Sequence, residues 1–126
     1  MPTELAQDLQ LATPEFMETL AHFVFARERD LQQVVFGAAG ILGWACRYHT
    51  YDSRRSPSGF PDAVFVRAPR VLFVEFKMPR GRLTKDQERW RDELCTSPGV
   101  EYYVWRPIDW MSGEILNRQA SASAIS

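Results

Sequence analysis

Two apolar runs follow each other between residues 62 and 77, separated by a short connection. Asp62–Arg67 and Val71–Lys77 are rich in Val and Phe, residues that favour β-strands. The intervening Ala68–Pro69–Arg70 has a length typical of a hairpin loop. We therefore predict two antiparallel strands. One face of the second strand is expected to pack against a helix through Leu72, Val74 and Phe76.

The register of this hairpin decides which polar side chains meet, because side chains alternate between the two faces of each strand. If Val66 pairs with Val71, Asp62 lies opposite Glu75, with their Cβ atoms about 5 Å apart. Lys77 then points the same way as Glu75. We expect two carboxylates and one ammonium group to converge at the open end of the hairpin.

Local signals predict further elements before the hairpin. Thr13 is a good N-cap for a first helix, whose apolar surface over residues 16–25 is wider than one core-facing stripe requires. A second helical stretch carries Glu28 at the head of an apolar face and stops at Gly43. Residues 44–49 read as a strand, and a polar loop rich in Ser, Arg, Pro and Gly follows.

After the hairpin, Thr84 and Gln87 have the spacing of a capping box, which predicts a helix over Lys85–Cys95. A fourth strand is predicted over Val100–Trp105, and a short last helix over Asp109–Leu116 with Asp109 as its cap. The order of elements is helix, three strands, helix and strand, with added helices at both ends. This order indicates a small mixed sheet flanked by helices, of the α/β or α+β class.

A chain of 126 residues with 45% hydrophobic residues is expected to form one domain, with a core that needs no disulfide or zinc site to stabilise it. Cys46 and Cys95 lie far apart and outside any CxxC pattern, so neither zinc nor a disulfide framework is indicated. The longest mainly apolar run, residues 34–46, is shorter than the ~20 residues of a membrane span, and the N-terminus lacks a signal pattern. We expect a soluble cytoplasmic protein with no membrane partner.

The net charge of −1 conceals a basic middle. Residues 47–91 contain 11 Lys or Arg and 5 Asp or Glu, a net charge of +6, whereas residues 1–46 and 92–126 carry −4 and −3. Thirteen of the 15 basic residues are Arg, whose planar guanidinium pairs with phosphate oxygens. A solvated, salt-bridged surface and a nucleic-acid partner both explain this pattern.

The expected meeting of Asp62 and Glu75 has a chemical consequence. Two adjacent carboxylates repel each other unless a cation lies between them, and oxygen ligands suit Mg²⁺ or Mn²⁺. A nearby Lys77 would hold or deprotonate a metal-bound water, and the metal would stabilise charge on a phosphoryl group. From spacing alone, an ordinary ion pair between Glu75 and Lys77, with Asp62 capping its strand, is the alternative.

Longer segments are more specific than this spacing. GFPD at 59–62 and EFK at 75–77 resemble the motif of the PD-(D/E)xK nuclease superfamily. Within that superfamily, the chain resembles the virus-type replication-repair nuclease (VRR-NUC) family over roughly residues 28–116. The closer resemblance rests on GW at 43–44, YHTYDSRRS at 48–56, VEFK at 74–77, RGRLTKDQ at 80–87 and VWRPIDW at 104–110. It implies a restriction-endonuclease-like αβββαβ core.

The resemblance also implies roles for individual residues. Asp62, Glu75 and the backbone carbonyl of Phe76 would bind the metal. Lys77 would serve the attacking water. Glu28 matches an additional acidic residue that helps bind the metal directly or through water; without the family resemblance, a favourable charge at a helix N-terminus is the preferred explanation of Glu28.

Two further residues have a structural and a functional interpretation. Gln87 matches a glutamine that leans toward the active site in this family, and the capping box with Thr84 is its alternative; both hold if the amide is shared. His49 contacts DNA at most, because a lone histidine that ends a strand is more often structural and a neutral imidazole suits zinc better than magnesium.

Basic loops flank the expected metal site on both sides. The residues expected to contact DNA phosphates are His49, Ser53, Arg54, Arg55, Arg80 and Arg82. Such contacts position a duplex without reading its sequence, so we expect recognition of DNA shape.

The resemblance implies a metal-dependent DNA endonuclease of the Holliday-junction resolvase type, which acts on branched DNA as a homodimer. The expected domain limits are a helical extension over residues 1–27 that contributes a dimer contact, a nuclease domain over 28–118 and a flexible tail over 119–126. Flap or restriction-type cleavage, and a DNA-binding module without catalysis, are the alternatives.

Overall fold

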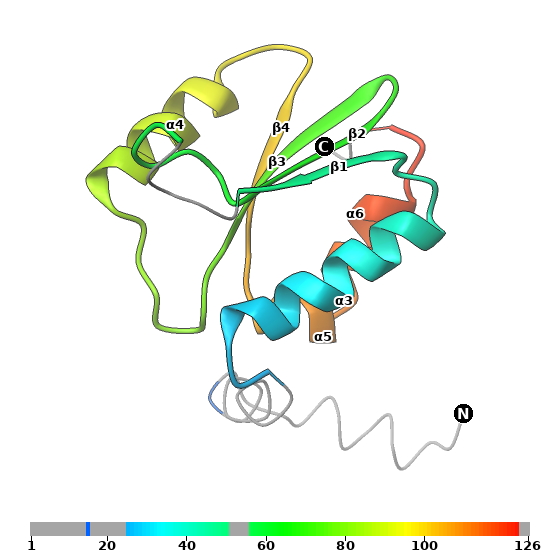
Figure 1. Ribbon diagram of the computed structural model, residues 1–126, viewed down its shortest axis with the longest axis horizontal. Coiled ribbons are helices and arrows are strands. Elements are labelled where there is room, and N and C mark those ends of the chain that lie inside the picture. The colour runs from blue at the N-terminus through cyan, green and yellow to red at the C-terminus, as the bar shows by residue number, and fades with distance from the viewer. Residues whose placement is uncertain (1–14, 16–24, 51–55, 124–126) are drawn as a thin grey trace.

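The computed structural model describes residues 15, 25–50 and 56–123 (Figure 1). The described elements of regular structure are α3 (Glu28–Ile41), β1 (Cys46–His49), β2 (Ala63–Arg67), β3 (Arg70–Phe76), α4 (Lys85–Cys95), β4 (Glu101–Trp105), α5 (Pro107–Met111) and α6 (Glu114–Ala120). They have the predicted order of helix, three strands, helix and strand. The mixed α/β class is therefore confirmed.

The described strands form a mixed sheet in the order β1-β2-β3-β4. The pairs β1–β2 and β2–β3 are antiparallel, and β4 runs parallel to β3. Helices α3, α5 and α6 lie on one side of the sheet and α4 lies on the other (Figure 1). The parallel pair follows from the chain path, because α4 carries the chain back across the sheet before β4 begins.

The predicted hairpin register is confirmed. Val66 pairs with Val71, and the ladder ends where Ala63 pairs with Val74. Strand β3 begins at Arg70, so the connecting loop is shorter than predicted. The predicted core face of β3 is also confirmed, since Leu72, Val74 and Phe76 are fully buried in one core with Leu31, Val35 and Ala39 of α3.

Local capping explains the helix limits. Helix α4 has the predicted bounds, because the Thr84 hydroxyl accepts a hydrogen bond from the Gln87 backbone N–H at 3.1 Å. Helix α3 ends before Gly43, which has a positive φ of 86° that favours glycine. The apolar surface predicted over residues 16–25 lies outside the described residues except for Phe25, which is buried in the core.

The C-terminal helices differ from the prediction. Asp109 does not cap a single helix over 109–116; it lies inside α5, where its carboxylate accepts the backbone N–H of the N-cap Arg106 at 2.7 Å. Pro107 fits the first helical position, which starts α5 earlier, and Gly113 with a φ of 84° separates α5 from α6.

The packed structure also continues into the region expected to be a flexible tail. Helix α6 ends at Ala120, and Gln119 is buried. The Gln119 backbone carbonyl accepts the indole N–H of Trp44 at 3.0 Å, while its side-chain amide donates to the Val35 carbonyl at 3.2 Å. Residues 119 and 120 therefore belong to the folded domain. None of the described helices is long and apolar enough to cross a membrane.

A buried arginine ties the turn end of the hairpin to β4 and α6. The Arg70 side chain is 3% exposed and makes two parallel hydrogen bonds to the Glu101 carboxylate, at 2.8 and 2.9 Å. It also donates to the backbone carbonyls of Arg118 and Ser121, both at 2.7 Å, and lies over the Trp44 ring. These contacts satisfy a charge that would be costly to bury alone.

We expect Arg70→Met to lower the free energy of unfolding by about 3 kcal/mol or more, because it removes the cation that pairs with the partly buried Glu101 and the donor to the Arg118 and Ser121 carbonyls. Urea denaturation measures the loss. Arg91→Met is the matched control, since Arg91 pairs with Asp92 on the surface, and it should change stability little. Equal losses in the two variants would contradict a structural role for the buried pair.

Candidate active site

Asp62 and Glu75 lie at the open end of the hairpin. They are the next residues after the last pair of the ladder, Ala63 and Val74, so the register places them opposite each other. Asp62 is fixed from two sides: its carboxylate accepts the Phe76 backbone N–H at 2.9 Å, and its own carbonyl accepts the Thr50 N–H at 2.8 Å. Asp62 is half-buried, and Glu75 is 2% exposed.

The Glu75 carboxylate is only partly satisfied. Its Oε1 accepts a hydrogen bond from the Gln87 side-chain amide at 2.9 Å, whereas its buried Oε2 has no partner among the described residues. Burial, and then the negative charge of Asp62, raise the pKa of Glu75 to about 9. Without a cation, this carboxyl group therefore holds a proton at neutral pH.

Gln87 makes hydrogen bonds that fit both of its interpretations. Its side-chain carbonyl accepts the Thr84 backbone N–H at 2.9 Å, which completes the capping box of α4. Its side-chain N–H donates to Glu75. The two interpretations are compatible because the amide has separate acceptor and donor atoms.

Glu28 and Lys77 surround the carboxylate pair electrostatically. Glu28 is the first residue of α3 and is half-buried. Burial and the charge of Asp62 raise the pKa of Glu28, whereas Lys77 acts in the opposite direction. Lys77 follows β3 directly, and its backbone N–H donates to the Trp105 carbonyl at 3.1 Å. Glu28, Asp62, Glu75 and Lys77 thus share one electrostatic neighbourhood.

The residues present fit a divalent cation at the hairpin end. The unpartnered Oε2 of Glu75 and the carboxylate of Asp62 are oxygen donors of the kind that Mg²⁺ and Mn²⁺ prefer, and such ions keep several waters. The Phe76 carbonyl stays a predicted third ligand. Among the described residues, no group of three or more His, Cys, Asp and Glu side chains is gathered to hold a metal. The structure therefore does not bring Glu28 into a common ligand cluster, and its contact with a metal remains a prediction.

His49 is integrated into the fold. Its Nε2 lies 2.8 Å from Oε1 of Gln32, and its ring packs edge-on against Phe36. Burial lowers the pKa of His49, although the charge of Asp62 opposes this. These contacts favour the structural interpretation. Its predicted contact with DNA stays untested.

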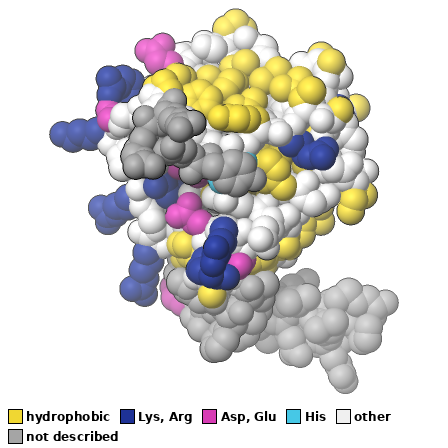
Figure 2. Space-filling view, viewed as in Figure 1, with side chains coloured by type: hydrophobic (Ala, Val, Ile, Leu, Met, Phe, Trp, Pro, Cys, Tyr) yellow, Lys and Arg dark blue, Asp and Glu magenta, His cyan; other side chains and the backbone are white. Residues whose placement is uncertain are grey.

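The basic residues after β3 lie on the surface. Arg80 and Arg82 are exposed, and Lys and Arg side chains gather along the edge of the molecule that carries α4 and this loop (Figure 2). Arg106 was missed by sequence reasoning: its guanidinium donates to the carbonyls of Met78 and Gly81, both at 2.8 Å, and so holds the loop. Arg106 lies in the VWRPIDW segment at 104–110, and that family-like segment was the sequence signal that could have pointed to it. Ser53, Arg54 and Arg55 lie outside the described residues.

A cavity of about 310 Å³ opens beside the carboxylates. It is lined by Thr50, Ser56, Pro57, Ser58, Gly59, Phe60, Asp62 and Gln87. One side of the candidate site is thus accessible to a ligand, along the loop that leads into β2.

A comparison with protein families identifies the family to which the sequence belongs. The family model of the VRR-NUC domain matches residues 4–107, which is most of the chain. The chain belongs to the VRR-NUC family. No curated protein and no solved structure matches it significantly. The match begins before residue 28, where the domain was predicted to start, and ends before residue 118.

Membership of the VRR-NUC family implies a nuclease-type function of the PD-(D/E)xK class, with DNA as the partner. In this VRR-NUC chain, the two acidic residues of the PD and EFK motifs lie opposite each other at the hairpin end, and the charge of Lys77 acts on Glu75. The fixed register of the two strands is the physical reason why Asp62 and Glu75 of the motif lie opposite each other.

Gly59 of the GFPD segment packs directly on α4. Its φ is 84°, and a Cβ atom there would lie 2.4 Å from the Asp86 carbonyl carbon and 2.7 Å from the Gln87 nitrogen. Only glycine allows the loop this close approach. Sequence reasoning missed this contact, because a GFPD segment does not show which helix lies beside it.

We expect Gly59→Ala to destabilise the protein more than Gly99→Ala. Both glycines have a φ near 85°, so each alanine adds backbone strain of about 1–2 kcal/mol, but a Cβ at Gly99 meets nothing within 4 Å. The clash with α4 should add about 1–3 kcal/mol at Gly59. Urea unfolding of the two variants measures the difference, and equal losses would show that α4 does not press on the loop.

We expect the metal-free Glu75→Gln variant to be more stable than the metal-free wild type, by a margin that grows as the pH rises from 5 to 9. The pKa of Glu75 is about 9 in the folded wild type, against 4.5 when unfolded. The wild type therefore gains stability from proton binding to Glu75, and this gain is complete below pH 4.5 and is lost as the pH rises toward 9. Glutamine cannot ionise, and its amide keeps an acceptor for Gln87. Thermal melting in EDTA across this pH range tests the prediction, and parallel profiles for variant and wild type would contradict it.

Proposed function

We propose that this VRR-NUC chain is a Mg²⁺- or Mn²⁺-dependent DNA endonuclease that hydrolyses phosphodiester bonds in branched DNA and leaves 5′-phosphate and 3′-hydroxyl ends. The observation that carries the proposal is the pair of carboxylates at the hairpin end. A buried Glu75 with one unpartnered oxygen beside Asp62 is an energetic cost that a bound cation would relieve.

Each residue of the site has a distinct task in this proposal. Asp62 and Glu75, with the Phe76 carbonyl, hold the cation, and the Gln87 amide orients Glu75. The cation, when bound, would stabilise the charge that develops on the phosphoryl group. Lys77, as an ammonium group, donates a hydrogen bond that orients the attacking water, whose acidity the bound cation would raise. Glu28 completes the negative surroundings from α3.

The proposed preference for branched DNA rests on the family resemblance, and the surface charge supports contact with DNA in general. Arg80 and Arg82 are exposed next to the candidate site, where they are suited to contact phosphates without reading bases. A homodimer, which would cut two strands of a junction symmetrically, and a cytoplasmic location are further parts of the proposal.

Labelled four-way junction, flap and linear duplex DNA of matched sequence, incubated with Mg²⁺, Mn²⁺ or EDTA, test the activity. Cleavage is expected with the metals and not with EDTA, and faster on the junction than on the duplex. Binding of all substrates without cleavage would instead support a DNA-binding module. Preference for the flap, or for linear duplex at a defined sequence, would overturn the junction assignment.

Lys77→Ala should reduce cleavage by about 100-fold or more and leave DNA binding unchanged, because Lys77 acts on the water rather than on the duplex. Lys85→Ala is the matched control, since Lys85 is the exposed first residue of α4. Single-turnover cleavage and gel-shift titration measure the two effects. Wild-type cleavage by Lys77→Ala would refute the role given to this lysine.

A further inference from the structure

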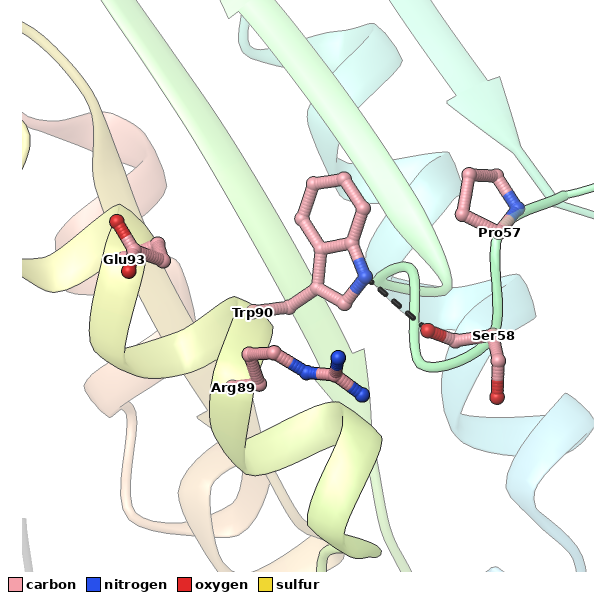
Figure 3. Close-up of a pocket in the computed structure, with 5 residues that line it drawn as sticks. All are labelled: Pro57, Ser58, Arg89, Trp90 and Glu93. Atoms are coloured by element: carbon pink, nitrogen blue, oxygen red, sulfur yellow. Dashed lines mark hydrogen bonds between the residues drawn. The ribbon is translucent and has the colours of Figure 1, made fainter.

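A second cavity adjoins the candidate active site. It measures about 450 Å³ and lies between α4 and the loop before β2, lined by Pro57, Ser58, Arg89, Trp90 and Glu93 (Figure 3). Its volume is within the range of small-molecule sites. Pro57 and Ser58 also line the cavity that contains Asp62 and Gln87, so the two cavities share one wall.

Trp90 forms a fixed aromatic surface in this second cavity. Its indole N–H donates to the Ser58 carbonyl at 3.1 Å (Figure 3), and its ring meets Phe60 edge-on at 5.1 Å between centroids. Trp90 is nevertheless only half-buried, and no residue of α4 is fully buried. The indole is thus held in place without being enclosed by the core, which is a suitable arrangement for stacking a planar ligand.

The charges around Trp90 favour a neutral planar group over a phosphate. Arg89 and Glu93 contribute one positive and one negative charge to the lining. The guanidinium of Arg89 is already paired with the carboxylate of Asp86, which also accepts the Ser58 hydroxyl at 2.5 Å. A largely apolar cavity with balanced charges and an aromatic wall matches a heteroaromatic ring.

We propose that this cavity binds one unpaired nucleobase of the DNA strand that is cut, stacked on Trp90. The inference rests on the proposed nuclease function. A base reaches the cavity only when it leaves the duplex stack, which is easiest at a branch point or flap where pairing is already interrupted. The Trp90 cavity therefore supplies a physical reason for selecting branched over linear DNA, independent of phosphate contacts.

Abasic scanning of the cut strand tests this proposal. Single abasic sites are placed at successive nucleotides around the cleavage point of a junction or flap. For the wild type, one position should lower kcat/KM by about tenfold, the range expected for one lost base–aromatic stack. Trp90→Leu should cut intact and abasic substrates equally, at the rate of the wild type on the abasic one.

Two further variants keep the test independent of folding. Glu93→Phe fills the cavity from an exposed position of α4, and it should abolish discrimination as Trp90→Leu does. Tyr48→Leu changes an aromatic residue that is 58% exposed on β1 and lines neither described cavity, and it should retain full discrimination. Circular dichroism and thermal melting establish that each variant is folded.

A binding measurement separates failure of the base site from failure of the nuclease proposal. 2-Aminopurine, placed in turn at each nucleotide around the branch point, should lose fluorescence at one position when it stacks on Trp90 in EDTA, and Trp90→Leu should not quench it there. If the wild type cuts DNA but cleaves the substrates at the same rate wherever the abasic site is placed, the base site is wrong and the nuclease proposal stands. Quenching by Trp90 without any metal-dependent cleavage retains the base site and overturns the nuclease.

Discussion

The pairing of β2 with β3 determines the positions of the two facing carboxyl groups of the candidate site, Asp62 and Glu75. Side chains alternate along a strand, so a slip of one residue would turn Glu75 toward the core and bring an apolar side chain to the site. The register is held because Leu72, Val74 and Phe76 are buried on the opposite face. The hydrogen bond from the Phe76 N–H to Asp62 then closes the open end of the hairpin. The packing of one face of β3 into the core therefore determines which side chains its other face presents to the candidate site.

The two ends of this hairpin have opposite electrostatics. At the turn end, the buried charge of Arg70 is matched by Glu101 and by backbone carbonyls. At the open end, the carboxyl groups of Asp62 and Glu75 lie opposite each other with no basic side chain bonded to them, and the second oxygen of Glu75 lacks a partner among the described residues. A fold that only maximised stability would not keep the second arrangement, since it raises the pKa of a buried carboxyl.

Elements governed by local chemistry could be predicted from the sequence. Helix α4 has its predicted bounds because Thr84 and Gln87 cap it within one turn. The hairpin register could be predicted because the connection is short. Contacts between distant segments could not: the loop after β3 is held by Arg106, and Gly59 lies against α4, although neither pair is close in sequence. The error at Asp109 has a local cause, since proline at the first position of α5 moved the helix start.

Helix α4 connects the carboxylates to the aromatic cavity. None of its residues is fully buried, so its position depends on a few specific contacts rather than on the core. Gln87 bonds Glu75, and Trp90 bonds the Ser58 carbonyl. Residues three apart in a helix share a face, so one face of α4 lines both cavities. A planar ligand on Trp90 would therefore press on the same helix that orients Glu75. If the two proposals hold, α4 is the element that joins the base on Trp90 to the carboxylate of Glu75, through the hydrogen bonds of Trp90 and Gln87.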